Sequence, residues 1–324
     1  MPRTKSTLCI AHIKDVDGLS SAALVKIATG SSVALADYGD LIDIMSKIES
    51  GGEVFVCDLG MNETISKNFV TEIKRLSKKG DVTYIDHHPL SPPLRKEISK
   101  AGAKVINSPT ECSGVLTYWH LRKKLPRRAA LLACYAAVTD YMDNGPKAKE
   151  FIGGFDRQYV LMEATLLSFA LAYSGGNENF LMRVVDSLAD MKPPHQIEGV
   201  VEFAQREAEK MNELLLTIGK TGKRHGKFAY AESEEHSLGH VANLLIGEFQ
   251  VPVGVALRRD HKNGLSEVSM RAHFTDKHHL GEIAGRMARK LGGAGGGHAK
   301  ASGLRIPTSR ISHFLELLKQ ELNL

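Results

Sequence analysis

The chain has 324 residues, of which 43% are hydrophobic and 24% charged, a balance that excludes disordered and fibrous proteins and suffices for two cores. Its 42 Lys and Arg exceed its 37 Asp and Glu, and the formal charge of +5 permits a polyanionic ligand without demonstrating one. Four scattered cysteines and an N-terminus without an apolar stretch predict a soluble cytoplasmic protein with free thiols. We expect no membrane association, because the most apolar segment (159–176) carries Glu163 and falls short of the ~20 residues that span a bilayer.

Short apolar runs alternate with amphipathic ones through the first half of the chain. Helical patterns at 18–29 and 63–80 lie between the runs, and Gly80 is the predicted C-cap of the second. This alternation is typical of right-handed βαβ units, so we expect an α/β domain with a mostly parallel sheet flanked by helices. The predicted strands are residues 7–12, 33–38, 53–58, 82–86 and 103–107.

The predicted secondary structure of the second half changes twice along the chain. Residues 113–215 are mainly helical, and 197–219 read as one long connecting helix. From about residue 225, short strands and helices predict a smaller α+β domain. Its predicted strands are 227–233, 252–260 and 265–273, and its predicted helices are 238–249, 280–291 and a closing helix. The predicted organisation is a domain at 1–190, a helical linker at 191–222 and a second domain at 223–324.

Acidic and imidazole side chains follow three of the predicted strands of the first domain. They are His12, Asp15 and Asp17 after the first strand, Asp58 after the third, and Asp86, His87 and His88 after the fourth. Ligands of open α/β sheets bind beyond the carboxyl ends of the strands, so these side chains converge if the strands are neighbours. So many carboxylates would repel one another unless cations lie between them.

The types of donor atom indicate which cations would bind at this edge of the sheet. Carboxylate with imidazole suits Mn²⁺, Zn²⁺ or Fe²⁺, and suits Mg²⁺ less well. Each pattern alone has an ordinary explanation: DxDG as a helix N-cap and turn, Asp58 as a strand end, and DHH as a polar turn. Their joint occurrence favours a dinuclear site, with metals about 3.5–4 Å apart and one bridging carboxylate.

The segments HIKDVDGLSS, FVCDLG, YIDHHP and AVTDYMDN resemble, in order, the four motifs of the DHH phosphoesterase superfamily across residues 9–144. VSMRAH and GGAGGGHAKASG resemble the smaller DHHA1 domain of the same superfamily. The resemblance implies a DHH metal-binding catalytic domain at 1–190 and a DHHA1 substrate-binding domain at 223–324.

The resemblance also implies a role for each motif residue. It assigns His12 and Asp15 to one metal, with Asp58 as the bridge. It assigns Asp17, His87 and Asp140 to the other metal. His88 and Asp86 are implied catalytic residues: His88 faces the scissile phosphate, and Asp86 orients a histidine. The fourth motif reads TDYMDN instead of TDTG, so the roles of the residues after Asp140 stay open.

The second domain supplies the candidate substrate-binding residues. Gly295, Gly296 and Gly297 allow close backbone approach to a phosphate or base, and His298 can donate a hydrogen bond. Without the resemblance the glycine-rich stretch also reads as a linker. Arg271 alone reads as a surface arginine, and the resemblance implies that it grips a phosphate.

These features predict a metal-dependent hydrolase of phosphoric ester bonds with two divalent ions, Mn²⁺ first and Mg²⁺ or Co²⁺ as substitutes. The first hypothesis resembles the compact nanoRNases (oligoribonucleases) and pAp phosphatases, which act on short single-stranded RNA or DNA or on small nucleotides, and it allows a homodimer. Trp119 lies in the apolar pattern VLTYWHL and reads as core, which favours short substrates over a base-stacking channel.

The alternative is a RecJ-like single-strand exonuclease that acts with replication or repair proteins. A metal-free replication scaffold and a family II pyrophosphatase are weaker hypotheses, because all seven motif positions are filled and the C-terminal motif is GGGH. The choice among RNA, DNA, pAp and cyclic dinucleotides stays open, as do the direction of digestion and the physiological metal.

Overall fold

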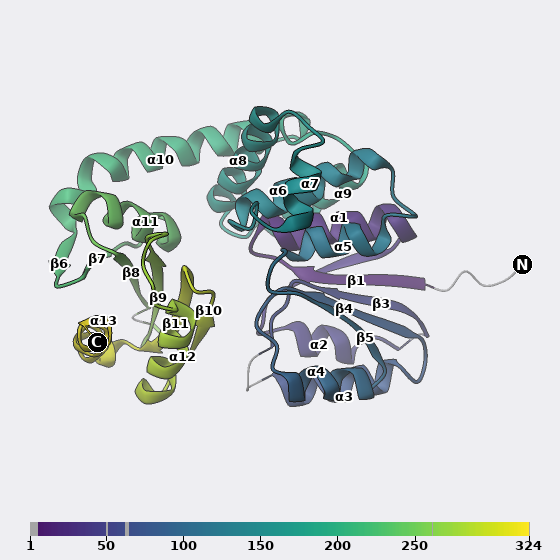
Figure 1. Cartoon of the computed structure of the whole chain (residues 1–324), viewed down its shortest axis with the longest axis horizontal. Coiled ribbons are helices and arrows are strands. Elements are labelled where there is room, and N and C mark those ends of the chain that lie inside the picture. The colour runs from purple at the N-terminus through teal and green to yellow at the C-terminus, as the bar shows by residue number, and fades with distance from the viewer. Residues whose placement is uncertain (1–5, 50, 62–64, 261, 324) are drawn as a thin grey trace, which may run out of the picture. The chain divides into compact units, whose positions relative to one another are not determined.

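The computed structural model describes residues 6–49, 51–61, 65–260 and 262–323. It divides into two compact units, residues 1–207 and 208–324, each of which is described separately below (Figure 1). The boundary falls within helix α10 (Val200–Thr221). None of the described helices is long and apolar enough to cross a lipid bilayer.

The first unit is built on a five-stranded sheet with the order β2-β1-β3-β4-β5, in which every pair of neighbours is parallel. This confirms the predicted α/β class and places the first, third and fourth strands side by side. The strands are β1 (Ser6–His12), β2 (Ser32–Ala36), β3 (Gly52–Cys57), β4 (Asp81–Asp86) and β5 (Ala103–Asn107).

Helices cover both faces of this sheet, α1 and α5 on one face and α2, α3 and α4 on the other (Figure 1). Residues of β3 alternate between the two cores: Phe55 packs under α1 and α5, and Val56 packs against α3. The helices are α1 (Val16–Thr29), α2 (Leu41–Ser46), α3 (Ser66–Leu76), α4 (Pro92–Lys100) and α5 (Ser113–Leu121).

Further helices extend the core of the α1 face, which confirms the mainly helical character predicted for residues 113–215. They are α6 (Ala130–Thr139), α7 (Pro146–Ile152), α8 (Arg157–Ser174) and α9 (Glu178–Ala189), with the short 3₁₀ turns η1 (Arg127–Ala129) and η2 (Pro194–Gln196).

The predicted role of Gly80 is wrong. Helix α3 ends at Leu76 with Ser77 as its C-cap, and Gly80 lies in the turn that leads into β4. A Cβ atom at Gly80 would lie 1.8 Å from the carbonyl oxygen of Gly52. The glycine is therefore required by the close approach of this turn to β3, and not by a helix terminus.

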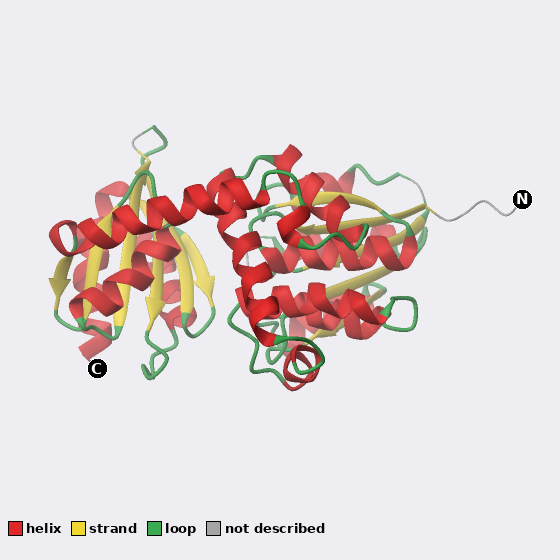
Figure 2. Cartoon of the chain, turned by 90° about the horizontal axis from the view of Figure 1, so that it is seen from above, coloured by secondary structure: helices red, strands yellow, loops and turns green. Residues whose placement is uncertain are grey.

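The second unit contains a six-stranded sheet with the order β10-β11-β9-β8-β7-β6 (Figure 2). Its neighbours are antiparallel except β7 and β8, which are parallel. The strands are β6 (Lys223–His225), β7 (Phe228–Glu232), β8 (Val253–Asp260), β9 (Leu265–Ala272), β10 (Ala294–Gly297) and β11 (Ala301–Pro307). The glycine-rich stretch is thus an edge strand and a turn, and not a linker.

Successive residues of the second sheet also face different cores. Val255 and Leu257 pack with α12 and α13, while Ala256 between them packs with α10 and α11. The helices of this unit are α11 (Leu238–Phe249), α12 (Leu280–Leu291) and α13 (Ile311–Asn323), with the 3₁₀ turn η3 (Thr308–Arg310). The α+β character predicted for this part of the chain is confirmed, with helices on both faces of the sheet.

Candidate metal centre

The register of the parallel sheet determines which side chains meet at the candidate metal centre. Ala11 of β1 pairs with Cys57 of β3, and Cys57 pairs with Ile85 of β4. The next residues along the three strands are His12, Asp58 and Asp86. They therefore stand at the same level, at the carboxyl edge of neighbouring strands.

The first group of donor atoms comes from β1, α1 and the end of β3. His12 Nδ1 lies 2.7 Å from Asp15 Oδ2 and 3.6 Å from Asp58 Oδ2. Asp15 is the N-cap of α1, and its Oδ1 accepts a hydrogen bond from the amide of Gly18 at 2.9 Å. Asp15 can therefore act both as the helix N-cap and as a metal ligand. Its Oδ1 caps the helix, and its Oδ2 lies in the donor group with His12.

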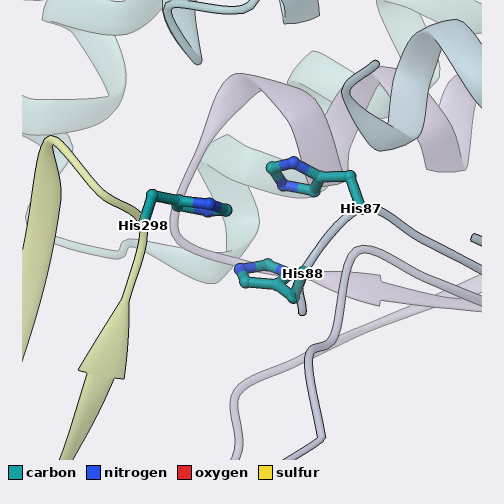
Figure 3. A group of neighbouring side chains, drawn as sticks. All are labelled: His87, His88 and His298. Carbon is teal, nitrogen blue, oxygen red and sulfur yellow. The ribbon is translucent and has the colours of Figure 1, made fainter. Parts of the chain in front are cut away.

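The second group surrounds His87, which follows β4. Figure 3 shows His87 beside His88. His87 Nε2 lies 3.3 Å from Asp58 Oδ1, 3.4 Å from Asp140 Oδ2 and 3.7 Å from Asp17 Oδ2. Asp58 therefore faces both groups, one oxygen toward each. Donor atoms that share one ion at about 2.1 Å lie roughly 3–3.5 Å apart; the distances from His87 to Asp58 and Asp140 fall in this range and that to Asp17 is slightly longer.

The buried oxygens of the centre fit a cation better than a hydrogen-bond network. Asp58 Oδ2 and Asp140 Oδ2 are buried and have no hydrogen-bond partner among the described residues. Such atoms are costly unless a ligand satisfies them. Asp58 also adopts a left-handed backbone conformation (φ 60°), and strain of this kind concentrates at functional sites.

Like charges dominate the electrostatics of the metal-free centre. Burial and the nearby carboxylates of Asp17 and Asp15 raise the pKa of Asp58 well above its usual value. Burial also raises the pKa of Asp140, against the attraction of His87. Burial alone would lower the pKa of His12, but Asp15 and Asp58 outweigh it and raise the pKa well above the usual value.

Asp86, the last residue of β4, holds the ring of His88 and is itself held by Tyr84. His88 Nδ1 lies 2.8 Å from Asp86 Oδ1, and Asp86 Oδ2 accepts a hydrogen bond from the hydroxyl of Tyr84 at 3.0 Å. Asn107 of β5 donates to the carbonyl oxygens of Asp86 and His88, both at 3.0 Å. Burial opposes the charge on His88, but Asp86 outweighs it, so the pKa of His88 is raised.

The N-terminus of α5 supports the two buried aspartates. The amides of Ser113 and Gly114 donate to Asp17 at 2.8 and 2.6 Å, and the Ser113 hydroxyl donates to Asp58 Oδ1 at 3.0 Å. A helix N-terminus stabilises a carboxylate through these amides and through the helix dipole. A Cβ atom at Gly114 would lie 2.7 Å from the Cβ of Ala136, so only glycine allows this approach.

Asp140 is placed by the C-terminus of α6. The Tyr141 amide donates to the carbonyl of Val138 and the Met142 amide to that of Ala137, with Tyr141 at φ 56°, which is a Schellman turn. This turn also brings Met142 Sδ to 3.1 Å from His87 Nδ1. The departure from TDTG thus replaces the small residues after Asp140 by an exposed tyrosine and a sulfur contact to a candidate ligand.

The candidate substrate residues of the second unit gather at one end of its sheet. Arg271 of β9 pairs with Ala301 of β11, and its guanidinium donates to the Ser269 hydroxyl at 3.0 Å. His298 follows β10, and its amide donates to the carbonyl of Ala301 at 2.7 Å (Figure 3). Gly297 has φ 131°, a conformation that only glycine adopts readily.

Two further adjacent histidines, His278 and His279, directly precede α12. The side chain of His279 caps α12 by accepting from the amide of Glu282, and His278 contacts Asp276. The four cysteines are buried and free.

One domain of the chain matches a known family model, and a short segment matches a curated protein. Residues 225–324 match the family model of the DHHA1 domain. A 70-residue segment is 34% identical to the uncharacterized protein MJ0988 of Methanocaldococcus jannaschii, a match that covers 22% of this chain and only 21% of that protein.

Solved structures share the fold of the whole chain at low identity. The pGpG-specific phosphodiesterase PggH of Vibrio cholerae is 17% identical, with a TM-score of 0.59 over 98% of this chain and 99% of that one. The DHH domain of PF0399, a member of a family of ribosomal proteins, is 16% identical, with a TM-score of 0.69 over 98% of this chain and 87% of that one. RecJ of Thermus thermophilus in complex with Mn²⁺ is 14% identical, with a TM-score of 0.65 over 99% of this chain and 52% of RecJ.

Residues 225–324 therefore form a DHHA1 domain, and the chain has the two-domain fold of DHH/DHHA1 proteins.

Sequence reasoning did not find several residues that shape the centre. Ser113 and Met142 contact candidate metal ligands, and Tyr84 and Asn107 contact the candidate catalytic residues Asp86 and His88. Ser113 could have been found as the start of a predicted helix that follows a strand. The other three carry no pattern of their own, because only the register of β4 and β5 and the turn after α6 bring them to the centre.

Proposed function

We propose that the chain is a phosphoesterase with two divalent metal ions that hydrolyses phosphodiester or phosphomonoester bonds of short oligonucleotides or nucleotides. The observation that carries this proposal is the pair of donor groups at the strand ends, His12 with Asp15 and Asp17 with His87 and Asp140, which share Asp58. The activities named for PggH and RecJ support the reaction class. Mn²⁺ is the first choice of metal, as in the RecJ structure, and Mg²⁺ and Co²⁺ are substitutes.

Such a metal pair, when bound, stabilises charge on phosphoryl oxygens and lowers the pKa of water. The protein's own contribution is to fix the ligand atoms before substrate arrives. Ser113 and Gly114 hold the carboxylates of Asp17 and Asp58, and Met142 contacts the ring of His87 at Nδ1 so that Nε2 faces the aspartates. Oriented ligands of this kind reduce the reorganisation that binding costs.

His88 is the proposed catalytic residue on the substrate side. Asp86 holds Nδ1, so Nε2 is the atom that donates a hydrogen bond to the phosphate. The raised pKa of His88 favours the charged imidazolium, which is the form that stabilises a phosphate anion. The second unit supplies the proposed binding residues for the rest of the substrate: Arg271, His298 and the backbone of Gly295–Gly297.

A length series tests the proposed substrate class. Dinucleotides, five-mers and forty-mers, each as RNA and DNA and labelled at either end, are digested with Mn²⁺, with Asp140→Ala as the blank. We expect rates that fall steeply with length. Equal or faster cleavage of the forty-mer would favour the RecJ-like alternative, and no cleavage of any probe by the metal-loaded protein would contradict the proposed oligonucleotide substrates.

Metal binding is expected to release protons. His12 and His87 have raised pKa values because Asp15 and Asp17 outweigh the effect of burial, and Asp58 and Asp140 have raised values from burial and like charge. A raised pKa keeps the proton on the group as the pH rises, and a metal must displace it. Affinity for Mn²⁺ should therefore increase with pH above the usual imidazole value of about 6.5.

Calorimetry checks this directly. Titration of Mn²⁺ at pH 7 in PIPES and in HEPES, which differ in ionisation enthalpy, should give different observed heats. Equal heats in the two buffers would mean that the donor atoms are already deprotonated and that the electrostatic description of the centre is wrong.

A further inference from the structure

A strongly basic surface lies on the first unit at the far end of α5 from the metal centre. Residues 113–139 contain five Arg and Lys and no Asp or Glu. All five are exposed, and they follow α5 and form the turn η1. We call them the basic cluster: Arg122, Lys123, Lys124, Arg127 and Arg128.

The cluster is not neutralised by acidic neighbours. Within the described ranges, no carboxylate lies in ion-pair distance of these five side chains, whereas many other cations of the first unit pair with acids, such as Lys26 with Asp186 and Lys47 with Asp43. The neighbourhood is cationic enough to act on His120, whose pKa is lowered by partial burial and then by Lys104, Lys124 and Arg122. Concentrated positive charge of this kind attracts polyanions.

An exposed aromatic side chain lies beside the cluster. Trp119 is 37% exposed, so its predicted place in the core is wrong. The guanidinium carbon of Arg122 lies 4.0 Å from the centre of the Trp119 ring, and the Lys147 ammonium of α7 lies 5.2 Å from it. Phe151 supports the ring from α7 at 6.3 Å between centroids. A partly exposed indole beside two cations offers a nucleobase an aromatic surface on which to stack, while its phosphates contact the charges.

We propose that Trp119, Lys147 and the basic cluster bind single-stranded nucleic acid. Trp119 stacks a base, and the cations contact phosphates without reading sequence. Six residues separate Ser113, which contacts Asp58, from Trp119, and at 1.5 Å each the helix spans about 9 Å. At 3.4 Å per stacked nucleotide this is about three nucleotides. A strand longer than that can reach this surface. The contact adds binding affinity and is separate from the cleavage rate, which we expect to fall with length.

Binding is measured without metal, so that its outcome is independent of the proposed phosphoesterase activity. Fluorescently labelled 5-mers and 20-mers of oligouridylate and oligothymidylate are titrated with the full chain in EDTA, and fluorescence anisotropy is recorded at several salt concentrations. The chain has one tryptophan, so its intrinsic fluorescence reports Trp119 alone. We expect tighter binding of the 20-mer, with quenching of Trp119.

The test variant is Lys123→Glu/Lys124→Glu, and its matched control is Lys67→Glu/Lys74→Glu. The control changes the net charge equally, at two exposed lysines of α3 on the opposite face of the sheet. We expect the test variant to weaken 20-mer binding at least about tenfold and to reduce the salt dependence, since each lost phosphate contact on a single strand lowers the slope by about 0.7. Trp119→Leu should weaken binding about fivefold or more.

Three results would overturn the proposal: equal losses in the test and control variants, no change in tryptophan fluorescence on saturation, or binding of phosphatidylserine vesicles but of neither oligonucleotide. Circular dichroism of both charge variants establishes that they are folded, so a loss of binding can be assigned to the surface.

Discussion

Asp58→Asn is expected to abolish metal-dependent hydrolysis, by roughly 10³-fold or more, while it raises the melting temperature of the metal-free protein. Asp58 is the residue whose two oxygens face both donor groups. Asparagine keeps the shape and can still accept the hydrogen bond from Ser113, but it removes the charge that a bridging ligand supplies.

The opposite effect on stability follows from the sign of the pKa shift. Burial and the carboxylates of Asp17 and Asp15 raise the pKa of Asp58 in the folded state. A group with a raised pKa contributes stability below its unfolded value of about 3.9, and this contribution is lost as the pH rises through the folded value. At neutral pH the folded metal-free protein therefore carries a repulsion that Asp58→Asn removes.

Thermal unfolding of the wild type and Asp58→Asn, each with EDTA and with Mn²⁺, measures both effects. We expect Mn²⁺ to raise the melting temperature of the wild type much more than that of the variant. Asp43→Asn, an exposed aspartate on α2, is the control and should behave as the wild type. A variant that keeps the full stabilisation by Mn²⁺ would show that Asp58 is not a shared ligand.

Alanine substitutions of the adjacent histidines His87 and His88 are expected to impair different properties, metal affinity and kcat. His87→Ala should lose metal affinity, because Nε2 of His87 is within 3.7 Å of three candidate ligand carboxylates. His88→Ala should keep metal affinity and lose about 10²–10⁴ in kcat, because His88 is held by Asp86 as a group for the substrate. His313→Ala, an exposed histidine of α13, is the matched control.

Calorimetric metal affinity and kcat, measured on the same preparations, separate these roles. If His88→Ala lost metal affinity as fully as His87→Ala, the role proposed for His88 would be wrong, and the group formed by Asp58, Asp86 and His88 would need to be considered as a ligand set.

Most of the metal centre could be predicted from the sequence because its residues follow apolar strands. His12, Asp58 and Asp86 each end such a run, and a parallel sheet brings the ends of neighbouring strands together whatever the details of packing. Asp140 could be assigned only by resemblance, because it lies at the end of a helix and its position depends on how α6 packs against α1.

The errors have physical causes in contacts that no local pattern contains. Gly80 follows a helix and reads as its cap, but β3 requires the glycine. Trp119 lies in an apolar run, yet in α5 the buried face holds Tyr118 and Leu121, and Trp119 between them turns outward. Composition alone cannot decide which side of a short apolar helix is exposed, because the answer depends on its neighbours in space.

Anomalous diffraction at the manganese absorption edge from crystals grown with Mn²⁺ tests the central claim most directly. The account predicts two peaks about 3.5–4 Å apart, one beside His12 and Asp15 and one beside Asp17, His87 and Asp140, with Asp58 between them. A single peak, or peaks that leave Asp58 without a metal, would contradict the proposed dinuclear centre.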